Sequence, residues 1–378
     1  MLHGDNLKFY PYLNKQLVAC PGLVITLLDS SKHQQKYRVQ AHGIIPLNRV
    51  KGAGMRGTVT KLTFEALDQA SEHGLLLEPE TPPIKRALER LYNSGLVVRP
   101  HRGLYAKTST WHALTQRERY LIGLRSLSLM HPDWIFCSYS AAALFGIDIP
   151  YCTMKQIHVV ASRTGAHGQI YQHHLRNIEE DRIDGIPVVA LERTVASVVD
   201  QLAFPHALGV VDAALRIKGR HAEELFECID KLPGHGFNRK YVNDVVSYGD
   251  NRSENGGESY ARAIMIEQGV MLPELQVEHY DPITGSCYRD DFEWTLAHHN
   301  IAGELDGMRK YTSIARANGK SIEDVMCEER QRESRLRNQG LQFARFTFEQ
   351  VRQVRPFLNI LDSCGIPRIG RNERSPHK

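Results

Sequence analysis

The sequence predicts a multidomain protein of the α/β and α+β class. It has 378 residues, and domains commonly contain about 100–150 residues, so we expect two or three of them. Stretches with helical periodicity and stretches with strand-like alternation follow one another along the chain. Hydrophobic residues make up 42% and charged residues 24%, which is typical of a globular protein.

The first segment, residues 1–55, is basic. Residues 1–60 contain eight Lys or Arg and two Asp, a net charge of +6, whereas the whole chain carries only +4. Nucleic-acid contact and a solvated basic tail are both compatible with this charge. Residues 51–57 (KGAGMRG) are rich in glycine and predict a flexible joint before the next domain.

The composition argues against a membrane protein and against a secreted one. The longest apolar run, residues 17–28, is interrupted by Pro21-Gly22 and is too short to span a bilayer. No small-x-small cleavage site follows it. The seven cysteines are scattered and form no CxxC pair, which favours free thiols over zinc sites or disulfides. We therefore expect a cytoplasmic protein without a membrane partner.

Residues 56–110 predict two helices followed by a hairpin. Apolar residues recur at helical spacing over residues 62–73 and again over residues 84–92. Two short apolar stretches, 96–98 and 104–106, flank a polar turn and predict a two-stranded hairpin. Helix, helix and hairpin is the order of elements in a winged helix.

This predicted element is strongly basic. Residues 85–107 contain six Lys or Arg and one acid, Glu89, which gives a local charge of +5. Clustered cations favour contact with nucleic-acid phosphates, although a solvated protein surface can have the same composition.

The segment IKRALERLYNSGLVVRPHRGLYAK resembles the N-terminal winged helix of the AbiEi-type antitoxins of type IV toxin–antitoxin systems. The resemblance implies double-stranded DNA as a ligand and a cognate toxin protein as a partner. The second helix would enter the major groove, and the hairpin would contact the DNA backbone. The DNA-binding residues implied in this way are Lys85, Arg86 and Arg90 on the helix and Arg99, His101 and Arg102 on the hairpin.

Residues 111–230 alternate helical and extended patterns and predict a compact α/β module. The stretches SAAALFG at 140–146 and LERT at 191–194 have counterparts after the winged helix of AbiEi-like proteins, but neither is a catalytic signature. Four histidines lack the spacing of metal ligands, so we interpret them as surface or hydrogen-bonded side chains: His158, His167, His173 and His174.

Residues 250–362 predict the order helix, three strands, helix, strand and helix. The first helix is expected over residues 253–268, with Glu254 and Glu258 on one face. Three extended stretches follow it, at 275–280, 287–294 and 300–306. Residues 363–378 are expected to form a flexible tail.

Acidic residues gather on one face of the predicted sheet. Strand alternation places Asp291 on the face opposite to Phe292, and Glu304 and Asp306 share one face of the next strand. Converging carboxylates repel each other, and Mg²⁺ would remove this repulsion and could orient a water for phosphodiester hydrolysis. A charged sheet face exposed to water explains the same pattern without a metal.

The motifs SENGGES, RDDFEW and GELDGMRKY, in this order of elements, resemble the PD-(D/E)XK nuclease superfamily and its very short patch repair endonuclease-like branch. The resemblance implies a restriction-endonuclease-like αβββαβ domain with Asp291 and Glu304 as Mg²⁺ ligands and Glu258 as an auxiliary acid. Asp306 stands where many members have lysine, and Lys310 would substitute for that lysine.

Two functions follow from these patterns. The first is a DNA-binding protein in which a winged helix delivers a Mg²⁺-dependent endonuclease-like domain to duplex DNA. The alternative is a transcriptional regulator or type IV antitoxin whose nuclease-like fold is catalytically silent. Fold analogy by itself does not decide between them.

Overall fold

The computed structural model describes residues 55–233, 236–281, 284–306, 319, 321–338 and 340–370. The basic segment expected at residues 1–55 and the candidate Lys310 therefore lie outside the described residues, except for Met55. The chain divides into two compact units, residues 1–62 and residues 63–378, and the division falls within helix α1 (Met55–Glu72).

The predicted second helix and hairpin are present. The elements are α2 (Pro82–Asn93), β1 (Val97–His101), β2 (Leu104–Lys107) and a short helix α3 (Thr108–Ala113). The two strands pair antiparallel, and Leu77 adds an isolated bridge to Tyr105 of β2. Residues 63–72 of α1, helix α2 and the hairpin share a small core: Leu67, Ile84, Leu88, Leu91, Val97 and Tyr105.

The middle of the chain is a mixed α/β module, as predicted. Its helices are α4 (Gln116–Met130), α5 (Ser138–Leu144), the 3₁₀ turn η2 (Tyr151–Thr153), α6 (Leu191–Val199), α7 (Phe204–Lys218), α8 (Ala222–Asp230) and α9 (Arg239–Val246). Its strands are β3 (Ile157–Val160), β4 (Gly165–His167), β5 (Ile170–His173), β6 (Glu180–Ile183) and β7 (Ile186–Val189). Strands β3 and β5 are parallel, whereas β4 pairs antiparallel with β5 and β6 with β7.

The C-terminal elements follow the predicted order. They are α10 (Gly256–Glu267), β8 (Glu274–Asp281), β9 (Ser286–Thr295), β10 (Asn300–Asp306), α12 (Ile322–Asn338), β11 (Gln342–Thr347), α13 (Phe348–Arg352) and α14 (Arg355–Ser363). The sheet has the order β11-β10-β9-β8, with β10 and β11 parallel and the other neighbours antiparallel. Helix α10 starts later than predicted because the side chain of Asn255 caps it, so Glu254 precedes the helix.

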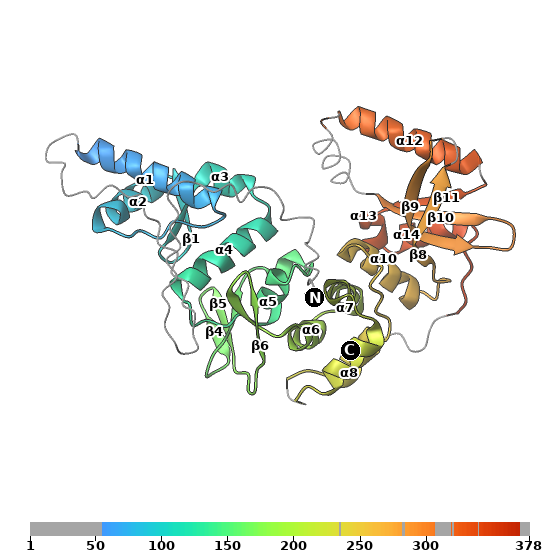
Figure 1. Cartoon of the computed structure of the whole chain (residues 1–378), viewed down its shortest axis with the longest axis horizontal. Helices are drawn as coiled ribbons and strands as arrows, with labels where there is room; N and C mark the ends of the chain where they lie inside the picture. Colours follow the sequence, from blue (N-terminus) through green and yellow to red (C-terminus); the bar gives the residue numbers. More distant parts are fainter. Residues whose placement is uncertain are drawn as a thin grey trace, which may run out of the picture. The chain divides into compact units, whose positions relative to one another are not determined.

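This sheet lies between two helical layers (Figure 1). One face packs on α10, α13 and α14 through Phe292 and Trp294 of β9 and Phe346 of β11. The opposite face packs on α12, where Leu336 contacts a second cluster that contains Ala302 of β10. Strand β10 and the second half of β9 therefore carry buried residues on both faces, and buried polar residues there must find partners.

Helix α10 joins two cores. Its Ala263 and Ile266 belong to the core of the middle module, whereas Ala261, Ile264 and Met265 belong to the core under the C-terminal sheet. The helix packs closely on α7: a Cβ atom at Gly209 of α7 would lie 3.6 Å from Cα of Gly256 and 3.7 Å from Cβ of Ser259.

The end of the chain differs from the flexible tail expected from residue 363. Val270 and Arg368 form an antiparallel bridge, and the amide of Ile369 donates to the carbonyl of Gly269. Ile366 is buried against the C-terminal core. Residues 366–369 are thus held by the loop after α10, and residues 371–378 lie outside the described residues.

Two expectations from composition concern the chain as a whole. None of the described helices combines the length and the apolarity needed to cross a lipid bilayer. The six cysteines in the described ranges are free thiols, as the scattered spacing predicts.

Gly303 of β10 provides a test of the sheet packing. A Cβ atom at this position would lie 2.6 Å from Cζ3 of Trp294 and 3.0 Å from Cβ of Phe292, both of which are buried. We expect Gly303→Ala to lower the free energy of unfolding by about 1–3 kcal/mol, measured by urea denaturation. Gly165→Ala in β4 is the control, because its added Cβ would meet nothing within 4 Å. Equal effects of the two substitutions would contradict this account of the packing.

Candidate functional site

Helix α2 carries an exposed basic face. Its apolar side is buried through Ile84, Ala87, Leu88 and Leu91, which recur at helical spacing. Thr81 is extended and Pro82-Pro83 occupy the first helical positions, so the helix starts two residues before the apolar pattern that predicted it. Because the apolar side is buried, the cations of this helix point to solvent: Lys85, Arg86 and Arg90.

The hairpin adds two more exposed cations. Arg99 of β1 lies 5.2 Å from the ring centre of the exposed Tyr92 of α2, and Arg102 lies in the turn before Gly103, whose φ is +82°. We call the following five residues the basic surface: Lys85, Arg86, Arg90, Arg99 and Arg102. None of them forms an ion pair with another described residue, so these charges are available to a ligand.

His101 lies on the same hairpin but is turned away from the basic surface. Its Nδ1 lies 2.9 Å from Oε1 of Gln169, and its ring lies against Gly123 of α4, where an added Cβ would be 2.6 Å from Nε2. Burial lowers the pKa of His101 below its ordinary value of 6.5, so the ring is neutral at pH 7. The structure therefore assigns His101 to packing between the hairpin and α4, and not to contact with phosphates as expected.

Glu258, the expected auxiliary acid, is buried at the start of α10. Its carboxylate accepts from the amide of Glu254 at 2.7 Å, from the side chain of Asn255 and from Nε2 of Gln276 at 3.1 Å. These donors fix the N-terminus of the helix and link it to β8. Glu258 thus accepts hydrogen bonds both from the residues just before α10 and from β8.

The alternation of side chains along β9 is interrupted, so that even-numbered residues face α12 in its first half and the opposite side in its second half. Gln276, which would pair with Asp291 across the β8–β9 ladder, has a φ of +57° and interrupts that ladder. Before the interruption Tyr288 packs on the α12 side, and after it Phe292 packs on the opposite side. Simple alternation, which predicted Tyr288 and Phe292 on the same face, therefore fails at this point.

The two expected metal ligands have different hydrogen-bond partners. The carboxylate of Asp291 accepts a hydrogen bond at 3.0 Å from the backbone amide of Leu305, which belongs to the neighbouring strand β10. Glu304 is buried and faces α12, where its neighbour from β9 is Asp290. Burial, and then the nearby Glu304 carboxylate, raise the pKa of Asp290 to about 6.

Two guanidinium groups bind Glu304. Arg332 of α12 donates to Oε1 and Arg345 of β11 donates to Oε2. Arg345 also lies 3.3 Å from Asp306, and Arg332 lies 3.3 Å from Asp290. Both carboxylate oxygens of Glu304 are therefore occupied by cationic donors, and this arrangement does not fit Mg²⁺ binding by Glu304 and Asp291.

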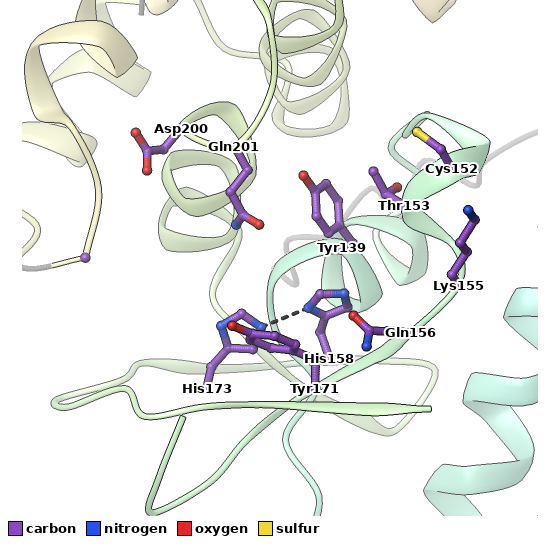
Figure 2. Close-up of a pocket in the computed structure, with 11 residues that line it drawn as sticks. Tyr139, Cys152, Thr153, Lys155, Gln156, His158, Tyr171, His173, Asp200 and Gln201 are labelled. Atoms are coloured by element: carbon purple, nitrogen blue, oxygen red, sulfur yellow. Dashed lines mark hydrogen bonds between the residues drawn. The ribbon is translucent and has the colours of Figure 1, made fainter. Parts of the chain in front are cut away.

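A cavity of about 650 Å³ lies in the middle module (Figure 2). Nδ1 of His158 and Nε2 of His173 are 2.8 Å apart, so one ring donates and the other accepts. Tyr139 and Tyr171 flank His158, with ring centres at 5.3 and 5.5 Å. Aromatic rings that line a cavity can stack on a planar ligand, and their polar atoms can form hydrogen bonds with it. Both imidazoles are hydrogen-bonded, as the spacing of these histidines led us to expect, but the sequence did not reveal the cavity.

Comparison with known proteins identifies two curated relatives, both named as uncharacterized proteins of Mycobacterium tuberculosis, from two strains. Each is 28% identical over 214 residues, which is 56% of this chain and 74% of the relative. No family model matches the chain. No solved structure matches it significantly.

The histidine pair predicts a pH-dependent stability. Burial, and then His173, lower the pKa of His158 to about 4, whereas an unfolded histidine titrates near 6.5. Between these values the unfolded chain binds more protons, so the free energy of unfolding should fall as the pH falls through this window. We expect the contribution of His158 to fall by about 2 kcal/mol between pH 7.5 and pH 5. It is measured by urea denaturation as the difference in pH dependence between the wild type and a His158 variant, because the raised pKa of Asp290 acts in the opposite direction in this window.

The matched variants are His158→Gln and His167→Gln. The first removes the buried imidazole and should remove its contribution of about 2 kcal/mol from the pH dependence. The second removes an exposed histidine from β4 of the same sheet and should leave the dependence intact. If His158→Gln keeps the full dependence, the protonation of another group is responsible.

Proposed function

We propose that this chain is a DNA-binding protein in which α2, β1 and β2 form a winged helix. The observation that carries the proposal is the basic surface, five exposed cations on one helix and the adjoining hairpin that form no ion pair with a described residue. A helix presents such cations to phosphates along the major groove, and a hairpin reaches the neighbouring backbone. The order of these elements and the resemblance to AbiEi-type antitoxins also support DNA binding by a winged helix.

We further propose that the C-terminal domain is a nuclease-like fold that does not hydrolyse DNA. The element order α10-β8-β9-β10-α12-β11 supports the resemblance to the PD-(D/E)XK superfamily. The occupation of Glu304 by Arg332 and Arg345 supports the silent form, because a guanidinium takes the place in which a hydrolase would need a metal ion. The protein would then act as a regulator of the antitoxin type, with a toxin as its protein partner.

DNA binding is tested by removing single cations from the basic surface. Arg86→Ala and Arg102→Ala should each weaken binding to a labelled duplex roughly five- to tenfold near 0.1 M salt, because each loses one phosphate contact. The slope of log K against log salt should decrease by about one for each. Lys231→Ala, an exposed cation at the end of α8, is the control. Unchanged affinity and slope in both variants would refute the winged-helix proposal.

Hydrolysis is tested with supercoiled and linear DNA incubated with the protein and Mg²⁺ or Mn²⁺. We expect no cleavage by the wild-type protein, because both oxygens of Glu304 are bound by arginines. Asp291→Ala and Glu304→Ala are measured beside it. Cleavage by the wild type that disappears in both variants would overturn the silent form and identify a metal-dependent endonuclease.

A further inference from the structure

Three metal-ligating side chains meet on the α12 side of the C-terminal sheet, away from Asp291. His279 comes from β8, and Asp290 and Glu293 come from β9. Nε2 of His279 lies 2.7 Å from Oε2 of Glu293 and 3.3 Å from Oδ2 of Asp290. All three ligand atoms lie within 4.8 Å of one another.

The interruption of the β8–β9 ladder explains why these residues meet. Asp290 and Glu293 are three positions apart and would point to opposite faces of a regular strand. Because the strand changes face at Asp291, opposite the positive φ of Gln276, both carboxylates point toward α12. His279 pairs with Tyr288 in the ladder and lies on the same face.

The outer oxygen of each carboxylate is held by a separate donor. Arg332 lies 3.3 Å from Oδ1 of Asp290, and Nδ2 of Asn300 donates to Oε1 of Glu293 at 2.8 Å. These contacts leave Oδ2 of Asp290 and Oε2 of Glu293 directed at the imidazole. Donors that orient the ligands from outside are a regular feature of protein metal sites.

Oδ2 of Asp290 is an independent sign that a ligand is missing. The Asp290 side chain is 0% exposed, yet Oδ2 accepts no hydrogen bond from any described residue. A buried carboxylate oxygen without a donor is costly, because it has lost water and gained no partner. A cation bound to this oxygen would remove that cost.

We propose that His279, Asp290 and Glu293 bind one divalent first-row transition metal ion, such as Mn²⁺, Fe²⁺ or Zn²⁺. An imidazole with two carboxylates suits these ions better than Mg²⁺ or Ca²⁺, which prefer ligand sets made of oxygen alone. Bonds of about 2.0–2.2 Å put neighbouring ligand atoms about 3 Å apart, which the three side chains reach with small movements. The ion would link β8 to β9 beside the interruption of their ladder.

Metal uptake by the full chain tests this proposal without DNA, so its outcome is separate from that of the DNA-binding proposal. Co²⁺ is followed by its absorption and Mn²⁺ by the loss of the signal of the free ion in electron paramagnetic resonance. We expect one ion per chain, a Co²⁺ spectrum without sulfur-to-metal charge transfer, and no displacement by excess Mg²⁺.

The variants keep the size of the carboxylate side chains. Asp290→Asn, Glu293→Gln and His279→Ala should each weaken Mn²⁺ binding by about tenfold or more, and Asn300→Ala by about tenfold. Glu278→Gln, an exposed acid next to His279, is the matched control and should bind as the wild type does. Tryptophan fluorescence, to which Trp294 buried on the other face of β9 contributes together with Trp111 and Trp134, reports that each variant is folded.

Three results would overturn the proposal: no uptake by the folded wild type, equal uptake by the folded ligand variants, or a cobalt spectrum with cysteine ligation. Either of the first two would mean that His279, Asp290 and Glu293 contact one another without binding a metal ion.

Discussion

The buried ion pair between Asp212 and Arg262 is the contact on which the rest of the second unit depends. Arg262 of α10 donates to both carboxylate oxygens of Asp212 of α7, at 2.9 and 3.0 Å, and the amide of Asp250 donates to the same carboxylate at 2.8 Å. Removing one partner of such a pair leaves a buried charge and typically costs about 3–5 kcal/mol. The pair holds α10 in the core of the middle module while its other side supports the C-terminal sheet.

This shared helix changes how the chain is divided. A domain boundary near residue 250 is expected from the sequence, because one pattern ends there and another begins. In the structure the core of the middle module continues into α10 through Ala263 and Ile266. The first helix of the C-terminal elements is thus also the last helix of the preceding core.

The chemistry of the C-terminal domain follows from a sheet in which β10 and the second half of β9 carry buried residues on both faces. Acids on the side of α12 cannot reach water freely, so each must find a cationic or hydrogen-bonding partner. Arg332 and Arg345 satisfy Glu304, while one oxygen of Asp290 keeps no donor among the described residues. The basic surface of α2 and the hairpin contrasts with this arrangement, because its cations are exposed and form no ion pair with another described residue.

The sequence by itself determined the helix and hairpin of residues 82–107, the order of the C-terminal elements and the exposed face of α2, because these depend on local periodicity and capping. It did not determine which acids meet. Alternation along β9 predicted Asp291 beside Glu304. On the neighbouring strand β8, however, Gln276 has a left-handed backbone conformation, and opposite it the side chains of β9 switch faces. Asp290 therefore lies beside Glu304. The direction of His101 and the cavity around His158 likewise depend on neighbours distant in sequence, Gln169 and His173. Only the tertiary structure decides such contacts, since a residue's partner across a sheet or between layers leaves no periodic signal in its own segment.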